Sequence, residues 1–414
     1  MLFYNSCAHR VHYGVCTLLL FQCRSVHIDF KVSHQPGEIR VRRQLTQQGI
    51  TGHAAAIKLR QESEQWTGML DQSLLEKSLI RLKEIYSTTQ PDSHQGGNDW
   101  ILQNKLQGIK HIAELLGSSY VDEYETYEEM VKGLKPEDLS RFYKNRLTSL
   151  STFLHEEGNW GYANYTDEEK QYITDRYCFL QVPFEVGYQE GWVQVSKHAP
   201  SLMKFCIILL SFSLAGIFSD EFTWKTDSVY YNTYHGRTKS VAMKLLLGFL
   251  IITLVYWLCM GSFSMVVLST LGSDGAEHFI QSCSETWNIR YSMTFRQYYW
   301  LILGAGYLGF LFYGFLIMWI SAKTRSSVFA VLIPPLMLLL PMFLHEIYSY
   351  FMRKVIGLLP HWLMDIGQAL RYQYLYKVGG QITCLVPIIL ILYFCLTMVL
   401  ICLCYWEYRH KQIA

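Results

Sequence analysis

The sequence predicts an all-α, polytopic membrane protein: a six-helix transmembrane bundle with a mainly helical extracytoplasmic domain between its first and second spans. Half of the 414 residues are hydrophobic and only 17% are charged, whereas soluble domains carry about 25% charged residues. The charge is unevenly distributed, because residues 35–199 have the composition of a soluble domain and residues 200–406 consist mostly of apolar runs. Five of these runs reach or nearly reach the length of about 20 residues that a helix needs to cross a bilayer.

The N-terminal residues 1–34 contain a short apolar run from Val11 to Cys23. Three interpretations are open: a first transmembrane span, a signal peptide with a basic start and a short apolar core, or neither. We favour the span, because no small-x-small cleavage site follows the run cleanly. With this span the bundle has six helices, and both ends of the chain are expected on the same side of the membrane.

Residues 35–199 are predicted to form the extracytoplasmic helical domain. After Pro136, apolar residues recur at intervals of three and four, which is the spacing of one face of an amphipathic helix. A second such pattern follows Asp71, and Thr166 with Glu169 has the spacing of a capping box that starts a third helix. A segment of this length can bury a hydrophobic core of its own.

Residues 200–406 are predicted to form the transmembrane domain. The fourth of its apolar runs contains Pro334, Pro335 and Pro341, and a proline inside a helix removes a hydrogen bond and bends the helix. Because the freed backbone groups need partners, we expect this span to be packed inside the bundle. The predicted spans of this domain are 200–218, 245–271, 297–320, 328–345 and 382–406.

The distribution of basic residues predicts the orientation of the chain. Lysine and arginine are dense in the loop 219–244, the linker 321–327 and the tail 407–414, and short cytoplasmic loops are enriched in these residues. The alternate loop 272–296 is poorer in them. We therefore expect the three basic segments in the cytoplasm and the domain 35–199 outside, in a multi-pass protein of the cell membrane.

The sequence predicts no catalytic, cofactor or metal site. Residues 304–309 match the letters GxGxxG of a dinucleotide fingerprint, but they lie in an apolar run without the strand, turn and acidic residue that the fingerprint requires. We interpret Ala305 and Gly309 instead as small residues for helix packing. There is no GxxxxGK[ST] phosphate loop, so the chain alone is not expected to hydrolyse ATP. The net charge of +2 gives no indication of nucleic-acid binding.

The loop after the first of these spans carries a distinctive pattern. An acidic pair, Asp220 and Glu221, closes the span, and residues 234–240, with the sequence YHGRTKS, lead into the next one. In these residues the chain resembles the permease subunits of type-2 ABC transporters. The resemblance covers about residues 200–406, and it is carried by a loop signature rather than by a catalytic motif.

The resemblance implies a permease subunit of an ATP-driven ABC transporter, an exporter that moves cargo through a dimeric helix bundle. It implies two kinds of partner, a separate ATP-binding subunit and a second permease subunit that is identical or different. The coupling surface for the ATP-binding subunit would comprise Asp220, Glu221, Arg237 and Lys239. A second hypothesis is a membrane receptor or scaffold whose outside domain binds a ligand.

Overall fold

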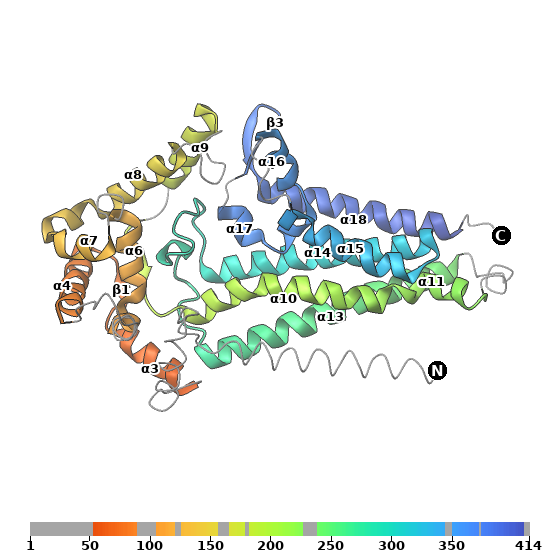
Figure 1. The fold of residues 1–414 in the computed structure, drawn as a ribbon, viewed down its shortest axis with the longest axis horizontal. Helices are drawn as coiled ribbons and strands as arrows, with labels where there is room; N and C mark the ends of the chain where they lie inside the picture. The colour runs from red at the N-terminus through yellow and green to blue at the C-terminus, as the bar shows by residue number, and fades with distance from the viewer. Residues whose placement is uncertain are drawn as a thin grey trace. The chain divides into compact units, whose positions relative to one another are not determined.

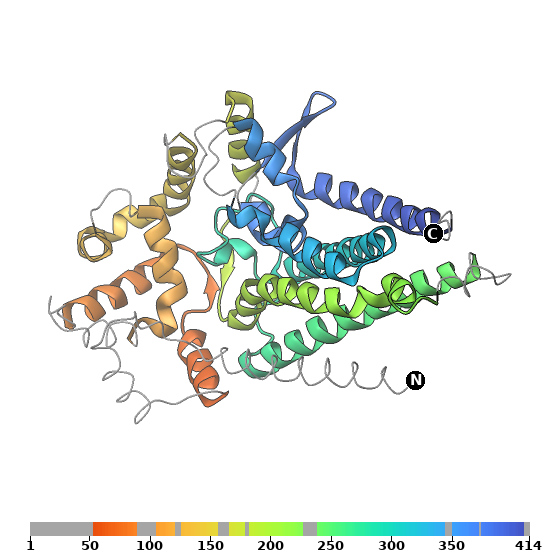
Figure 2. The same ribbon diagram turned by 45° about the vertical axis from the view of Figure 1, so that its right-hand side comes forward.

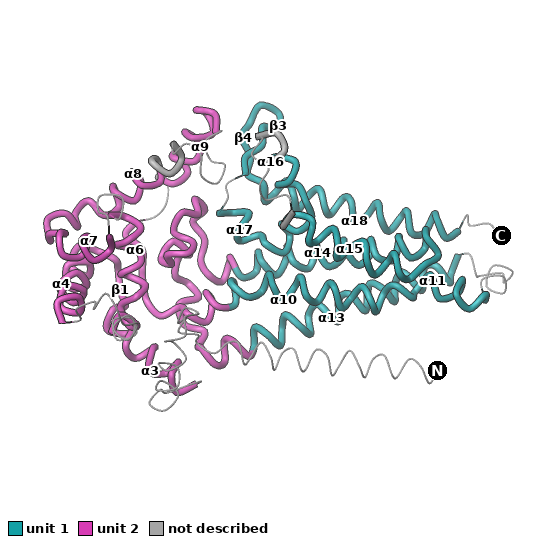
Figure 3. The backbone as a smooth tube through the Cα atoms, in the orientation of Figure 1, with its two compact units in different colours: residues 1–15, 195–265, 299–414 teal, residues 16–194, 266–298 magenta. Residues whose placement is uncertain are grey.

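The structure is a computed structural model, and it describes residues 53–88, 105–120, 126–155, 165–178, 182–226, 238–343, 350–371 and 374–409. These residues are mostly helical. They divide into two compact units (Figure 3). The N-terminal unit comprises the described parts of residues 16–194 and 266–298, and the C-terminal unit those of residues 195–265 and 299–414. The predicted span within residues 1–34 lies outside the described residues.

Helices dominate the N-terminal unit. A short antiparallel pair of strands, β1 (Gly68–Met69) and β2 (Glu185–Val186), joins two distant parts of it. The helices are α3 (His53–Glu64), α4 (Gln72–Thr88), η1 (Gln107–Ile109), α6 (Lys110–Tyr120), α7 (Tyr127–Gly133), η3 (Pro136–Arg141), α8 (Phe142–His155), α9 (Asp167–Cys178) and η4 (Ile280–Ser282).

Local sequence signals explain where several of these helices begin. The Asp71 carboxylate accepts a hydrogen bond from the Leu74 N–H (2.9 Å) at the start of α4. At the start of α9, Thr166 and Glu169 exchange backbone-to-side-chain hydrogen bonds of 3.0 and 3.3 Å, which confirms the predicted capping box. The amphipathic pattern after Pro136 is likewise helical, with a 3-10 turn before the α-helix.

The core of the N-terminal unit forms where α4 packs against α6, α7 and η3, and α6 packs against α8. Full burial of one large apolar side chain stabilises a fold by about 1.5–3 kcal/mol, so this cluster is the main source of stability in the unit. Its fully buried members include Leu75, Leu79, Leu82, Ile85, Ile112, Leu115, Leu116, Met130, Val131, Leu139 and Phe142.

Residues 272–294, which connect α13 (Lys239–Leu271) to α14 (Phe295–Thr324), belong to this unit rather than forming a simple connection. The Tyr188 hydroxyl donates to the Leu271 carbonyl (2.6 Å), and the Trp192 indole N–H donates to the Ser273 carbonyl (3.1 Å). Arg60 of α3 pairs with the carboxylate of Asp274, in the same segment, at 2.8 Å. Sequence reasoning treated this segment only as a loop poor in basic residues.

The C-terminal unit contains the long apolar helices, which run alongside one another in Figures 1 and 2. Four helices of the described chain are long and apolar enough to cross a membrane: Glu190–Thr223, Lys239–Leu271, Phe295–Thr324 and Leu385–Arg409. The chain is therefore an all-α membrane protein. Its long elements are α10 (Glu190–Leu214), α11 (Gly216–Thr223), α13 (Lys239–Leu271), α14 (Phe295–Thr324), α15 (Ser327–Phe343) and α18 (Leu385–Arg409).

One predicted span begins at a different residue in the structure, and another extends beyond the described residues. The run 328–345 corresponds to α15, a shorter apolar helix of 17 residues that remains helical through its three prolines. The predicted span 382–406 starts too early, because residues 381–384 form a strand and the helix begins at Leu385. Hydropathy averaged over a window does not separate a short strand from the apolar helix that follows it.

Short elements connect α15 to α18. They are α16 (Tyr350–Gly357), η5 (Pro360–Leu363), α17 (Ile366–Arg371), and a hairpin of β3 (Leu375–Val378) and β4 (Gln381–Cys384). Gly379 and Gly380 form the hairpin turn, and both have positive φ values, 57° and 85°. Two-residue turns of this kind require positive φ at both positions, which glycine adopts most readily.

Candidate functional site

The acidic pair that the sequence singled out lies just beyond a joint between two helices. The helix is interrupted at Ala215, between α10 and α11. The Ser321 hydroxyl of α14 donates a hydrogen bond to the Ala215 carbonyl (2.5 Å) and accepts one from the Ser219 N–H (3.1 Å). Both serines are fully buried. The Ser321 side chain is thus inserted between two backbone groups of the helix ladder, and it connects α14 to this joint.

Glu221 of α11 is the centre of a cluster that joins three helices. Its Oε1 atom pairs with Lys244 Nζ of α13 at 2.5 Å, and its Oε2 atom accepts a hydrogen bond from the Tyr408 hydroxyl of α18. The Lys244 ammonium lies 5.1 Å from the ring centre of Phe218 and 5.0 Å from that of Tyr408. We call these four residues the Glu221 cluster. An anion, a cation and two aromatic faces satisfy one another there.

Because the Glu221 cluster is buried, its charge pair contributes more to stability than an exposed pair would. Glu221 is only 9% exposed, and a buried charge pair loses about 3–5 kcal/mol when one partner is removed. An exposed pair contributes about 1 kcal/mol or less. Glu221 is thus committed to contacts inside the bundle. Its role at a coupling surface stays a prediction, and any such role would act through α13 and α18 rather than by direct docking.

The other half of the acidic pair has a different environment. Asp220 is exposed, as are Trp224 and Lys225 at the end of α11 and Lys239 at the start of α13. Trp224 is 76% exposed, so a large apolar ring stands in the open beside charges of both signs. We call Asp220, Trp224, Lys225 and Lys239 the exposed face.

Basic groups from other segments come to the same end of the C-terminal unit. The guanidinium of Arg325, in the linker 321–327, lies 5.0 Å from the ring centre of Phe222 in α11. Tyr408, in the basic tail 407–414, contacts Glu221 of α11. The linker 321–327 and the start of this tail therefore both lie next to α11. Arg237, which the sequence assigned to the coupling surface, lies outside the described residues.

The small residues predicted for helix packing lie in the interior of α14. Ala305 is buried, and a Cβ atom added at Gly309 would collide with the Met364 side chain. This is the close approach that small residues permit. The whole of residues 304–309 is helical, so the glycine-rich turn that a dinucleotide site needs is not formed by these residues.

Sequence reasoning missed a second charge pair, between Lys204 of α10 and Asp365. Asp365 lies between η5 and α17, and its side chain is 15% exposed. A lysine inside an apolar run calls for an acidic partner. Between residues 300 and 400 the sequence offers only Glu346 and Asp365, so this pairing was within reach of the sequence.

Two sets of contacts connect α11 to neighbouring helices of the C-terminal unit. Ser321 ties α14 to the joint between α10 and α11, and the Glu221 cluster ties α11 to α13 and α18. These contacts connect α11 to three other helices. Within the described stretches, no group of three or more His, Cys, Asp or Glu side chains is arranged to hold a metal ion.

No family model matches the chain, and no curated protein or solved structure matches it either. Its function is accordingly inferred from its residues and their geometry.

Proposed function

We propose that the chain is a permease subunit of an ATP-driven ABC transporter, working as an exporter in the cell membrane. The observation that carries this proposal is the division of the acidic pair. Asp220 is exposed beside Trp224, whereas Glu221 is bound to α13 and α18. A protein that docks on the exposed face can therefore displace α11 and, through Glu221, two further helices.

In this mechanism the ATP is hydrolysed on separate chains. Each of two permease subunits, identical or different, binds one ATP-binding subunit through its exposed face. Closure of the ATP-binding subunits pushes α11, and the ties at Ser321 and Lys244 pass the displacement to α14 and α13. The paired bundles then repack between two arrangements as rigid bodies, and cargo crosses between them.

The proposal places the exposed face in the cytoplasm and residues 35–199 outside the cell. The basic residues Lys225, Lys239 and Arg325 at one end of the C-terminal unit support this orientation. On a cysteine-free background, a cysteine replacing Asp175 should react with a membrane-impermeant maleimide in intact cells. A cysteine replacing Lys239 should react only after the membrane is opened, and the opposite pattern would contradict the proposal.

Charge reversal at Asp220 tests the docking role. The chain, purified in mild detergent with its ATP-binding subunit, should hydrolyse ATP. Asp220→Lys should weaken retention of that subunit at least tenfold, because a well-formed contact to a charged group is worth on the order of 2 kcal/mol. Asp175→Lys makes the same charge change on an exposed residue of α9 and should have no effect.

Two results would contradict the proposal. If Asp220→Lys and Asp175→Lys retain the ATP-binding subunit equally well, the exposed face is a solvated surface. If the unmodified chain associates with no ATP-hydrolysing protein, the alternative takes its place: a membrane receptor or scaffold whose outside domain binds a ligand.

A further inference from the structure

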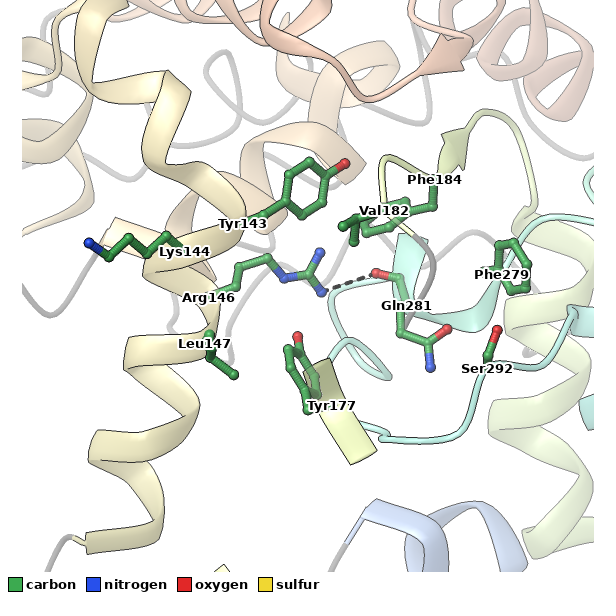
Figure 4. A pocket seen from close by; sticks show the side chains of 10 residues that line it. All are labelled: Tyr143, Lys144, Arg146, Leu147, Tyr177, Val182, Phe184, Phe279, Gln281 and Ser292. Atoms are coloured by element: carbon green, nitrogen blue, oxygen red, sulfur yellow. Dashed lines mark hydrogen bonds between the residues drawn. The ribbon is translucent and has the colours of Figure 1, made fainter. Parts of the chain in front are cut away.

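The N-terminal unit contains a pocket of about 330 Å³ (Figure 4). Its walls come from α8, α9, the segment before β2 and the segment around η4. The volume lies at the lower end of the range of about 300–1,000 Å³ that is usual for small-molecule sites. Most of its lining is aromatic or apolar, with Tyr143, Tyr177, Val182 and Phe184 among the residues that form it.

Arg146 of α8 supplies the buried charge of this pocket. It is 2% exposed, and its guanidinium lies among Tyr143, Tyr177 and Gln281 in Figure 4. The Nη2 atom donates long hydrogen bonds to the carbonyls of Gln281 (3.3 Å) and Trp287 (3.4 Å). Among the described residues, the Nε and Nη1 atoms have no acceptor within ordinary hydrogen-bond geometry. A guanidinium has five N–H donors, so most of this group's donor capacity is unused.

The described part of the chain provides no anion for Arg146. The residue takes part in none of the ion pairs formed there. The lining tyrosines cannot supply a charge, because burial raises the pKa of Tyr143 to about 12 and also raises the pKa of Tyr177. The rings of Phe142, Phe184 and Trp287 lie 5.7, 5.1 and 5.3 Å from the guanidinium. These contacts offset part of the cost of burying the ion, but a ring carries no negative charge to pair with the cation.

The geometry points to a binding site for a small organic anion, a carboxylate or phosphate attached to an apolar group. The anionic group accepts a charge-assisted hydrogen bond from Nε or from Nη1, the donors of Arg146 that the described residues leave without an acceptor. The apolar group lies against Val182, Phe184 and Phe279. The ligand thereby supplies the counter-charge that the described chain lacks. This inference does not rest on the proposed transport function.

Calorimetric titration of the full chain in detergent tests the site. The probes are phenylacetate and phenyl phosphate, with benzyl alcohol as the uncharged control. At least one anion should bind and benzyl alcohol should not, and the preference between the two anions distinguishes a carboxylate from a phosphate ligand. Absence of binding by both anions would overturn the inference.

Two matched variants assign the binding to the Arg146 guanidinium. Arg146→Met should weaken binding of the preferred anion at least tenfold. Arg141→Met makes the same change at an exposed residue that does not line the pocket, and it should change the affinity less than twofold. Equal losses in the two variants would mean that the anion is held by general surface charge, and would overturn the assignment.

A third variant and a stability measurement guard against misfolding. Val182 lines the pocket and is 53% exposed, so Val182→Trp should block the opening and abolish binding while Arg146 stays in place. Without a probe, Arg146→Met should unfold at the same temperature as the unmodified chain or a higher one, because it removes an unpaired buried charge. If Arg146→Met unfolds earlier and Val182→Trp still binds the anion, Arg146 is a structural cation and the site does not exist.

Discussion

Lys244 in the C-terminal unit and Arg146 in the N-terminal unit are both cations held among aromatic rings. Lys244 pairs with Glu221, whereas Arg146 has no carboxylate partner among the described residues. The difference teaches that aromatic surroundings alone do not reveal the role of a buried cation. Where the chain supplies the counter-charge, the cation holds helices together. Where the chain does not, the cation is available to a ligand.

The largest effect on stability is expected from removing Lys244, the cation that has a carboxylate partner. Lys244→Met leaves the Glu221 carboxylate buried without its cation, and it should destabilise the chain by about 3–5 kcal/mol. Glu221→Gln combined with Lys244→Met removes both charges and should recover most of this loss. Thermal unfolding of the purified variants measures the difference. Equal destabilisation by the single and the double change would show that packing, rather than the charge pair, stabilises this site.

A smaller effect is expected from a methyl group placed between helices of the C-terminal unit. Gly309→Ala puts a Cβ atom against Met364 and should cost about 1–3 kcal/mol through overpacking. Gly304→Ala is the matched control on the same helix, since nothing lies within 4 Å of its added Cβ. It should be neutral or slightly stabilising. Similar unfolding temperatures for the two variants would rule out close packing at Gly309.

The N-terminal unit should respond to mild acid. Burial lowers the pKa of His111 from 6.5 to about 4, a hydrogen bond with the Trp66 backbone opposes this shift, and the neighbouring His278 adds to it. The folded state therefore binds fewer protons than the unfolded state between these pKa values. Stability is complete above pH 6.5 and falls as the pH drops toward 4, by about 1 kcal/mol at pH 5.5.

Hydrogen exchange measures this acid response in the full chain. Protection factors of α6, corrected for the intrinsic pH dependence of exchange, should fall between pH 7.5 and 5.5. His111→Phe should remove most of the fall. Burial also lowers the pKa of His278, so a small remainder is expected. An undiminished fall in the variant would assign the acid response to other groups.

The smallest effect is expected at the joint between α10 and α11. Ser321→Ala removes two hydrogen bonds, but the Ala215 carbonyl keeps the one that it accepts from the Ser219 hydroxyl (2.8 Å). The cost should be about 1 kcal/mol. If the joint transmits displacement, this variant should lower ATPase coupling more than its stability loss explains. Full coupling in the variant would show that the tie to α14 is dispensable.

The sequence predicted well the helices and caps that depend on residues close to one another in the chain. The capping box of Thr166 and Glu169 and the amphipathic helix after Asp71 depend on short-range patterns, and the structure contains both. Four of the predicted apolar spans correspond to helices long enough to cross a membrane. The start of α18 was wrong by three residues, because an apolar strand precedes it. The pair Gly379–Gly380 between alternating residues is a hairpin signal that could have revealed this strand.

The candidate site was predictable only in part. The sequence drew attention to Asp220 and Glu221 but not to their opposite environments, since neighbouring helical positions face different directions. Tyr408 is 187 positions away from Glu221 in the chain, and no local sequence pattern predicts such a contact. The pocket around Arg146 also brings together distant segments, since Gln281 is 135 positions away from Arg146 in the chain, so it had no signal in the sequence.

The β3–β4 hairpin also indicates where the membrane surface lies. A two-stranded ribbon has open edges whose backbone groups hydrocarbon cannot satisfy, so the hydrocarbon layer begins no earlier than Leu385. At 1.5 Å per residue, a layer of about 30 Å ends roughly 20 residues later along α18. That depth falls at Tyr405 and Trp406, residue types that favour the interface. Tyr408, and with it the Glu221 carboxylate, then lies at the level of the lipid headgroups, where a charge pair is not held in hydrocarbon.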